Sequence, residues 1–293
     1  MRGRGRGEQY LIRAKTLHSS QRFTNIMITE LAPRGVRWFL LPLLLLAFFL
    51  GAYWLAGSEH PGVVATGVLV GKLFTLAGFV LAASRFSWGD RLHFAWSLFA
   101  LNMILLFGKD LCLLPSGVRC PGLDLSPEAT RTALGIVLSI ANIASTVATV
   151  LLARAWRESG MDIDPSKSHR IAKLAVVPLA LAIFALGVRD NMQKLPSDMW
   201  QTITLVLIPV SDLVCVSLIG SLALTAYSLR GGALALPWAM FTLGNVFWVL
   251  WDLAGIAHLS GPFRESLRIL ALGYTGSAAL EQWWVLRPHA QRE

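Results

Sequence analysis

Three ionisable side chains lie deep inside long apolar segments of this chain of 293 residues: Lys72, Asp212 and Glu281. A charged group at that depth in a bilayer is costly unless it meets an opposite charge, water or a ligand. We therefore expect these side chains to face the interior of a helical bundle. An interior lined in this way could bind an ion or a small polar solute.

Polar side chains converge on one layer when their depth is counted along each segment at about 1.5 Å per residue. Six residues fall near the middle of the membrane: Lys72, Asp212, Glu281, Asn102, Asn142 and Asn245. Lys72 and Asp212 have opposite charges and similar depths, which predicts an ion pair between them. One carboxylate is then in excess, so Glu281 or Asp212 is a candidate acceptor for a proton or cation. The asparagines have a structural alternative, because such side chains often only bond neighbouring helices together.

Two further carboxylates stand near the outer ends of their segments. Asp110 and Asp252 are 142 positions apart, and this symmetric placement predicts an outward-facing vestibule. The alternative is that both are ordinary solvated helix ends, since Asp110 directly follows Lys109.

Eight apolar segments must position these residues, and each is about long enough to cross a bilayer as a helix. They are 38–57, 62–84, 92–114, 131–153, 171–188, 201–229, 234–257 and 268–287. Hydrophobic residues make up 55% of the chain and charged residues 15%, which is typical of membrane proteins. We predict an all-α integral membrane protein with eight transmembrane helices, of which 38–57 and 171–188 lie at the periphery.

An internal repeat relates the two halves. A shift of 142 positions places Trp96 on Trp238 and Asp110 on Asp252, which predicts two parallel four-helix units over 38–153 and 171–287. A cytoplasmic linker, 154–170, joins the units. A basic tail, 1–37, precedes them and a short tail, 288–293, follows. The alternative is that leucine-rich segments align with one another by chance.

Basic residues alternate between the two sides of the predicted bundle. Eighteen Lys and Arg fall on the side of both termini and seven on the other, so the positive-inside rule places the termini in the cytoplasm. This pattern accounts for the net charge of +9, and nucleic acid is not an expected partner. The expected partner is the lipid bilayer of a plasma membrane or bacterial inner membrane.

Cysteine usage allows one disulfide. Cys112 and Cys120 share a connection predicted to lie outside the cytoplasm, where they could form a bridge or remain two free thiols. Cys215 stands alone in an apolar segment. No histidine or second cysteine pair accompanies them, so neither a metal nor another cofactor is expected.

The motifs of common hydrolases, metalloproteases and nucleotide-binding proteins are absent, which disfavours an enzyme. The favoured function is a proton-linked carrier for a small solute or ion, with its site at the polar midplane layer. One alternative is a membrane-embedded lipid-modifying enzyme that uses Asp110 and Asp252. Another is a ligand-sensing or assembly subunit that acts through a separate protein. The sequence names no substrate, protein partner or oligomeric state.

Overall fold

The computed structural model describes residues 37–57, 60–112, 127–158, 167–192, 199–228, 235–259 and 261–287, and these ranges contain helices and turns but no strand. The first helix is Arg37–Leu55. The others are α2 (His60–Ala83), α3 (Arg91–Cys112), α4 (Pro127–Glu158), α5 (Lys167–Met192), α6 (Met199–Ser228), α7 (Ala235–Ile256) and α8 (Pro262–Val285). The predicted all-helical architecture is confirmed. The tails 1–36 and 288–293 and the middle of the linker, 159–166, lie outside the described residues.

The start of α8 differs from its prediction. The helix begins at Pro262, six residues before the predicted segment, and follows Gly261, which has a φ of +78°. Proline suits the first turn of a helix because its missing N–H would have no partner there. Hydropathy misses this turn because Arg264, Glu265 and Arg268 make it resemble a loop.

Five helices of the described part are long and apolar enough to cross a bilayer, which suggests a membrane protein. They are the first helix, α2, α3, the Thr132–Ala155 part of α4, and α7. The segment α8 is instead the most buried helix of the bundle, and its charged residues are internal or line a pocket. Eight crossings and the internal repeat remain predictions.

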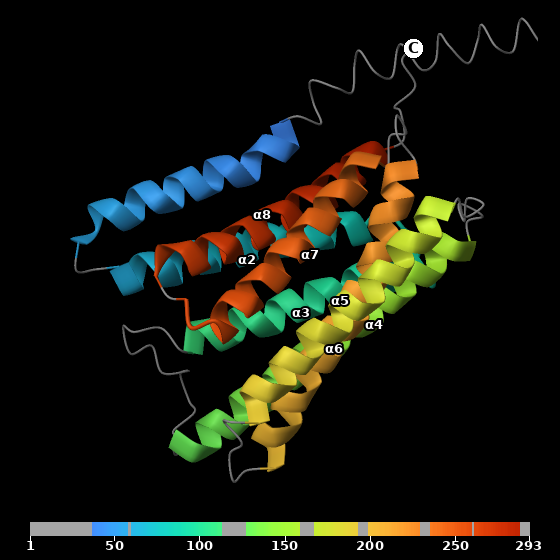
Figure 1. Ribbon diagram of the computed structural model, residues 1–293. Coiled ribbons are helices and arrows are strands. Elements are labelled where there is room, and N and C mark those ends of the chain that lie inside the picture. Colours follow the sequence, from blue (N-terminus) through green and yellow to red (C-terminus); the bar gives the residue numbers. More distant parts are fainter. Residues whose placement is uncertain are drawn as a thin grey trace, which may run out of the picture.

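Six helices form a closed ring through their packing. Going round the ring, α2 packs on α3, α3 on α4, α4 on α6, α6 on α7, α7 on α8, and α8 back on α2. The first helix lies across the outside of α2 and α8, while α5 lies against α6 on the opposite side of the bundle (Figure 1). The two helices predicted to be peripheral are therefore outside the ring.

Aromatic side chains fill the middle of the ring between α3 and α7. The ring centroids of Phe99 and Phe241 are 5.5 Å apart, and those of Trp96 and Phe241 are 5.9 Å apart. Phe79 of α2 stacks on Phe99 at 5.2 Å. These contacts belong to the main apolar core, which also contains Trp238. We call Phe79, Trp96, Phe99, Trp238 and Phe241 the aromatic plug.

Glycines let α2 and α8 approach closely. A Cβ atom added at Gly78 would lie 2.8 Å from the carbonyl oxygen of Gly276. Thr75 reinforces the contact, because its Oγ1 donates a hydrogen bond to the carbonyl oxygen of Leu272 at 2.8 Å. Small residues are typical of tightly packed helix pairs in membranes.

The substitution Gly78→Ala is expected to lower the free energy of unfolding by about 1–3 kcal/mol, because the new methyl group has no space beside Gly276. The matched control is Gly108→Ala in α3, where an added Cβ meets nothing within 4 Å. Alanine favours a helix over glycine, so the control is expected to be neutral or stabilising. Thermal unfolding in detergent measures both variants, and equal stability of the two would contradict the close packing.

Candidate ligand-binding site

Lys72 provides the deepest charged group of the site. Its side chain is 1% exposed, and its Nζ lies 2.6 Å from Oδ2 of Asp110. The same Nζ donates a hydrogen bond to the carbonyl oxygen of Leu106 at 2.8 Å. Leu106 and Asp110 are one helical turn apart on α3, so both acceptors lie on the face that α3 turns toward α2. The ammonium group is thus neutralised and hydrogen-bonded within the bundle.

The predicted ion pair between Lys72 and Asp212 is wrong. Lys72 pairs with Asp110, and the described residues contain no ion pair between Lys72 and Asp212. The helices that carry Lys72 and Asp212, α2 and α6, are separated in the ring by α3 and α4 on one side and by α7 and α8 on the other.

Asp110 is shared by three cations. Its Oδ2, which pairs with Lys72, also accepts a hydrogen bond from Nη2 of Arg268 on α8 at 2.9 Å. Its Oδ1 lies 3.2 Å from Nζ of Lys109. The carboxylate is 16% exposed, and Arg268 is 17% exposed. Ion pairs of this kind are stable when partly buried charges compensate one another and are hydrogen-bonded. The three-cation cluster of Asp110, Lys72, Lys109 and Arg268 therefore connects α2, α3 and α8.

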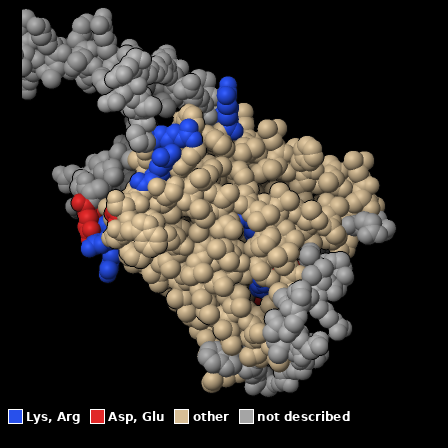
Figure 2. Space-filling view, turned by 180° about the vertical axis from the view of Figure 1, so that it is seen from behind, with Lys and Arg blue, Asp and Glu red and all other residues tan. Residues whose placement is uncertain are grey.

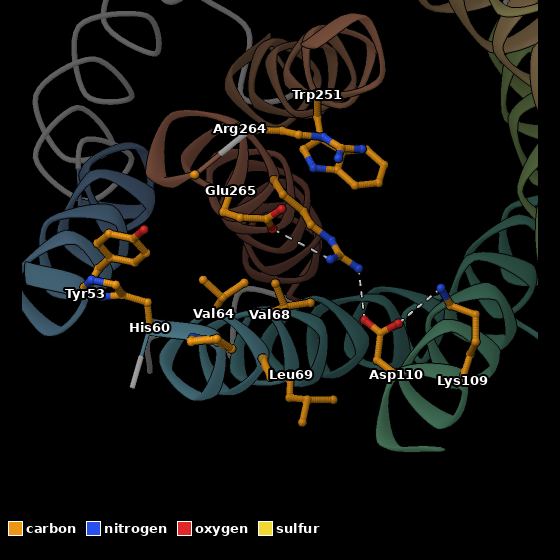
Figure 3. Close-up of a pocket in the computed structure, with 14 residues that line it drawn as sticks. Tyr53, His60, Val64, Val68, Leu69, Lys109, Asp110, Trp251, Arg264 and Glu265 are labelled. Atoms are coloured by element: carbon orange, nitrogen blue, oxygen red, sulfur yellow. Dashed lines mark hydrogen bonds and ion pairs between the residues drawn. The ribbon is translucent and has the colours of Figure 1, made fainter. Parts of the chain in front are cut away.

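A pocket of about 630 Å³ opens beside this cluster. Its lining comes from the first helix, the start of α2, the end of α3, the end of α7 and the start of α8. We call this end of the bundle the outer end, after the side that the charge distribution predicts for it, and the opposite end the inner end. Figure 3 shows Asp110 and Lys109 at one end of the pocket, Tyr53 and His60 at the other, and Trp251 with Arg264 across from Val64 and Val68.

Basic groups outnumber acidic ones around the pocket. Lys109, Arg264 and Arg268 line it together with Asp110 and Glu265, and Lys72 lies behind Asp110. Four formal positive charges thus face two negative ones. Arg268 also lies 3.8 Å from Glu265, so both carboxylates are used by cations that are already present.

Trp251 organises the two arginines. The guanidinium carbon of Arg264 lies 4.7 Å from the centre of the indole ring, and that of Arg268 lies 5.1 Å from it. Each such contact contributes about 0.5–2 kcal/mol, depending on how far it is shielded from water. A single ring therefore holds two like charges at the same side of the pocket.

Several polar atoms of the lining residues are buried without a hydrogen-bond partner in the described part of the chain. They are Nδ1 of His60, Nε1 of Trp251, Nε of Arg264, Nε of Arg268 and Oε2 of Glu265. Three of these atoms are obligatory donors, and a buried donor without an acceptor costs about 1–3 kcal/mol. The lining therefore has more donors than acceptors.

The two remaining predicted aspartates, Asp212 and Asp252, form no ion pair with the three-cation cluster in the described part of the chain. Asp212 of α6 and Asp252 of α7 are close enough for their carboxylates to repel each other, and Asp252 is attracted to Arg264 and Arg268. The outer vestibule predicted from Asp110 and Asp252 coincides with the outer-end pocket only for Asp110, because Asp252 does not line it.

The asparagines make structural bonds. Asn102 donates from Nδ2 to the carbonyl oxygen of Ala141 at 2.8 Å, which joins α3 to α4. Asn245 donates to the carbonyl oxygen of Phe241 within its own helix, also at 2.8 Å. The backbone oxygen of Asn142 accepts a hydrogen bond from Ser211 at 3.4 Å. Within the described ranges no hydrogen bond joins any two of the six predicted midplane residues.

Ser139 and Thr146 of α4 form side-chain hydrogen bonds with residues of α6. Ser139 pairs with Thr204 at 2.9 Å, and Thr146 pairs with Ser211 at 2.6 Å. Both pairs join α4 to α6. The side chains at these positions hydrogen-bond neighbouring helices to each other, as is common in membrane bundles.

Glu281 is 4% exposed near the inner end of α8, and its Oε2 has no hydrogen-bond partner among the described residues.

Cys112 is disulfide-bonded at the last position of α3, and Cys120, its predicted partner, lies outside the described residues. Cys215 is a free thiol. No group of three metal-ligating side chains occurs in the ranges that the structure describes.

Sequence reasoning missed Arg264, Arg268 and Trp251. Two signals could have found them: Arg264 and Arg268 are spaced for one face of a helix, and Trp251 is 142 positions after Lys109.

Comparison with protein-family models, with curated proteins and with solved structures finds no match for this chain.

Asp110→Asn is expected to destabilise the protein more than Lys72→Met. The first change leaves Lys72 without a carboxylate and Arg268 with only the longer contact to Glu265, and it is expected to cost about 3–5 kcal/mol. The second leaves Asp110 with Arg268 and Lys109 and is expected to cost less than half as much. Thermal or denaturant unfolding in detergent measures both, with Asp90→Asn in an exposed turn as the control.

The double variant Lys72→Met, Asp110→Asn completes this experiment. It is expected to be more stable than Asp110→Asn alone, because the stranded ammonium group is removed. Additive losses in the double variant, or a larger loss from Lys72→Met than from Asp110→Asn, would contradict the three-cation cluster.

Proposed function

We propose that this chain is a membrane-embedded carrier and that the outer-end pocket binds a small anionic solute. The observation that carries the proposal is the excess of cations and unpaired donors around the pocket. A carboxylate or phosphate group would neutralise the excess positive charge of the lining residues and accept hydrogen bonds from their unpaired donors. The volume of about 630 Å³ lies within the range of small-molecule sites.

Arginine is the residue that best recognises such groups. Its planar fork donates two parallel hydrogen bonds to a carboxylate or phosphate. Arg264 and Arg268 stand one turn apart on α8 and both contact Trp251, which restricts their movement. The opposite wall, which includes Val64 and Val68, is apolar. The expected solute therefore has one anionic end and a compact apolar part.

Asp110 would compete with the solute for the same cations. It pairs with Arg268 and Lys109, so an entering anion must share or displace it. Because the three-cation cluster connects α2, α3 and α8, such an exchange would change the contacts between these helices. A ligand that changes contacts in this way shifts the population of conformations, which is what a carrier requires.

The aromatic plug supports a carrier that is closed toward the inner end. Phe99 precedes Asp110 by eleven residues on α3, a distance of about 16 Å along the helix. Across α3 and α7, the ring centroids of Trp96 and Phe99 both lie within 6 Å of that of Phe241. Transport would require Phe99 and Phe241 to separate while the outer pocket closes.

The proton-linked part of the hypothesis rests on Asp212 and Asp252. Their helices, α6 and α7, pack together, and two carboxylates that repel each other favour the uptake of a proton by one of them. Asp252 also interacts with Arg264 and Arg268. Protonation of this pair would alter the field at the two arginines of the pocket. The enzyme alternative has less support, because a carboxylate bonded to three cations is a weak base.

Arg264→Gln and Arg268→Gln are each expected to weaken anion binding by about 10-fold to 100-fold, the value of one or two charge-assisted hydrogen bonds. Thermal stabilisation of the purified protein is measured with a panel of small carboxylates, organic phosphates and alkylammonium ions. Anions that stabilise the unmodified protein are then tested for uptake into vesicles that contain it.

Arg91→Gln is the matched control, because Arg91 lies at the inner end and pairs with Glu158. The control is expected to retain binding and uptake. Stabilisation by ammonium ions but not by anions would exclude the proposed ligand class. Anion binding without uptake in vesicles would exclude the carrier and leave a binding protein.

A further inference from the structure

A second group of cations and aromatic rings lies at the inner end of the bundle. The guanidinium carbon of Arg287 lies 3.8 Å from the centre of the Trp283 ring and 4.4 Å from that of Trp284. The guanidinium carbon of Arg85 lies 4.8 Å from the centre of the same Trp283 ring. Arg85 follows α2, Trp283 and Trp284 lie in the last turn of α8, and Arg287 follows that helix, so the cluster joins the ends of two packed helices.

The positive charges of this cluster have no counter-ion in the part of the chain that the structure describes. Neither Arg85 nor Arg287 forms an ion pair there, and Nε of Arg85 is buried without a hydrogen-bond partner. Arg91, at the same end of the bundle, is instead paired with Glu158. Two like charges on one indole repel each other, so an anion between them would be stabilising.

The carboxyl ends of α2 and α8 supply part of the compensation, since a helix dipole favours cations at its end. The helix dipole would explain one exposed arginine at the C-terminal end of each of these two helices. It does not explain why two guanidinium groups converge on one ring and leave a buried N–H unused.

An apolar stripe runs along the outside of α2 toward the turn that carries Arg85. Val70, Leu73, Ala77 and Val80 recur at helical spacing and are all exposed. They end one turn before Ser84 and Arg85. The broad face in Figure 2 is mostly tan, with small blue patches near its centre, and most of its charged side chains lie at its upper and left margins. Trp88, 90% exposed, lies just beyond Arg85 and is of the type that marks the headgroup level.

We propose that Arg85, Arg287 and Trp283 form a binding site for the phosphate of an anionic phospholipid in the inner leaflet, with an acyl chain along the α2 stripe. Two guanidinium groups can bind separate phosphate oxygens, and the headgroup and aromatic rings lie at the same level. The site is distinct from the outer-end pocket and shares no residue with it.

Native mass spectrometry of the full chain in detergent, with equal amounts of phosphatidylglycerol and phosphatidylcholine added, tests this proposal. The unmodified protein is expected to bind phosphatidylglycerol first and more tightly. Arg85→Gln and Arg287→Gln are each expected to weaken that binding about fivefold, and the double variant about 25-fold. Phosphatidylcholine also carries a phosphate, but its choline ammonium group cancels the net charge, so its binding is expected to be weaker from the start and to fall less in these variants.

Arg91→Gln removes a paired cation from the same end and is expected to keep the preference for phosphatidylglycerol. Arg85→Lys with Arg287→Lys keeps both charges and is expected to restore part of the affinity. Equal affinity for the two lipids, or an unchanged preference in the double glutamine variant, would overturn the proposal. Inorganic phosphate that displaces the lipid at similar concentration would also overturn it, because the acyl chain would then contribute nothing.

Discussion

The bundle depends on how one carboxylate neutralises several cations away from bulk water. Asp110 contacts Lys72, Lys109 and Arg268, and Lys72 is otherwise enclosed by apolar helices. Because these cations come from α2, α3 and α8, the same interaction that neutralises them also joins the helices around the pocket. The arrangement leaves the pocket with a positive excess, which an anionic solute could use. In the proposed function, stability and ligand choice would have a common electrostatic origin.

The sequence predicts the helices well because hydropathy and length report directly on them. The predicted segment 62–84 corresponds to α2, and 234–257 to α7, with shifts of one or two residues. The peripheral position of 38–57 and 171–188 follows from their lack of interior polar groups. The helices α4 and α5 extend four or five residues beyond 131–153 and 171–188 at each end, because hydropathy does not report polar helix ends. The start of α8 differs most, because a helical turn that faces a polar pocket has the composition of a loop.

The ion-pair partner of Lys72 could not be predicted from hydropathy and segment length. Depth along a helix locates a Cα atom, whereas the long lysine side chain carries its charge toward one membrane face. Asp212 matched Lys72 in Cα depth, but Asp110 lies on a helix that packs against α2. Which helices pack against each other is a property of the tertiary structure, and neither residue spacing nor the sign of a charge predicts it. The same limit explains why Arg268 and Trp251 were not placed beside Asp110.

Water access to the outer-end pocket tests the central claim most directly. Two valines of α2 provide a matched pair: Val64 lines the pocket, and Val70 is exposed on the outside of the helix. Each is replaced by cysteine in a Cys215→Ser background and treated with a membrane-impermeant maleimide in sealed vesicles. The thiol at 64 is expected to react from one side of the membrane, and the thiol at 70 to remain unlabelled in lipid. Labelling at 70 with none at 64 would contradict a hydrated, charged pocket inside an apolar bundle.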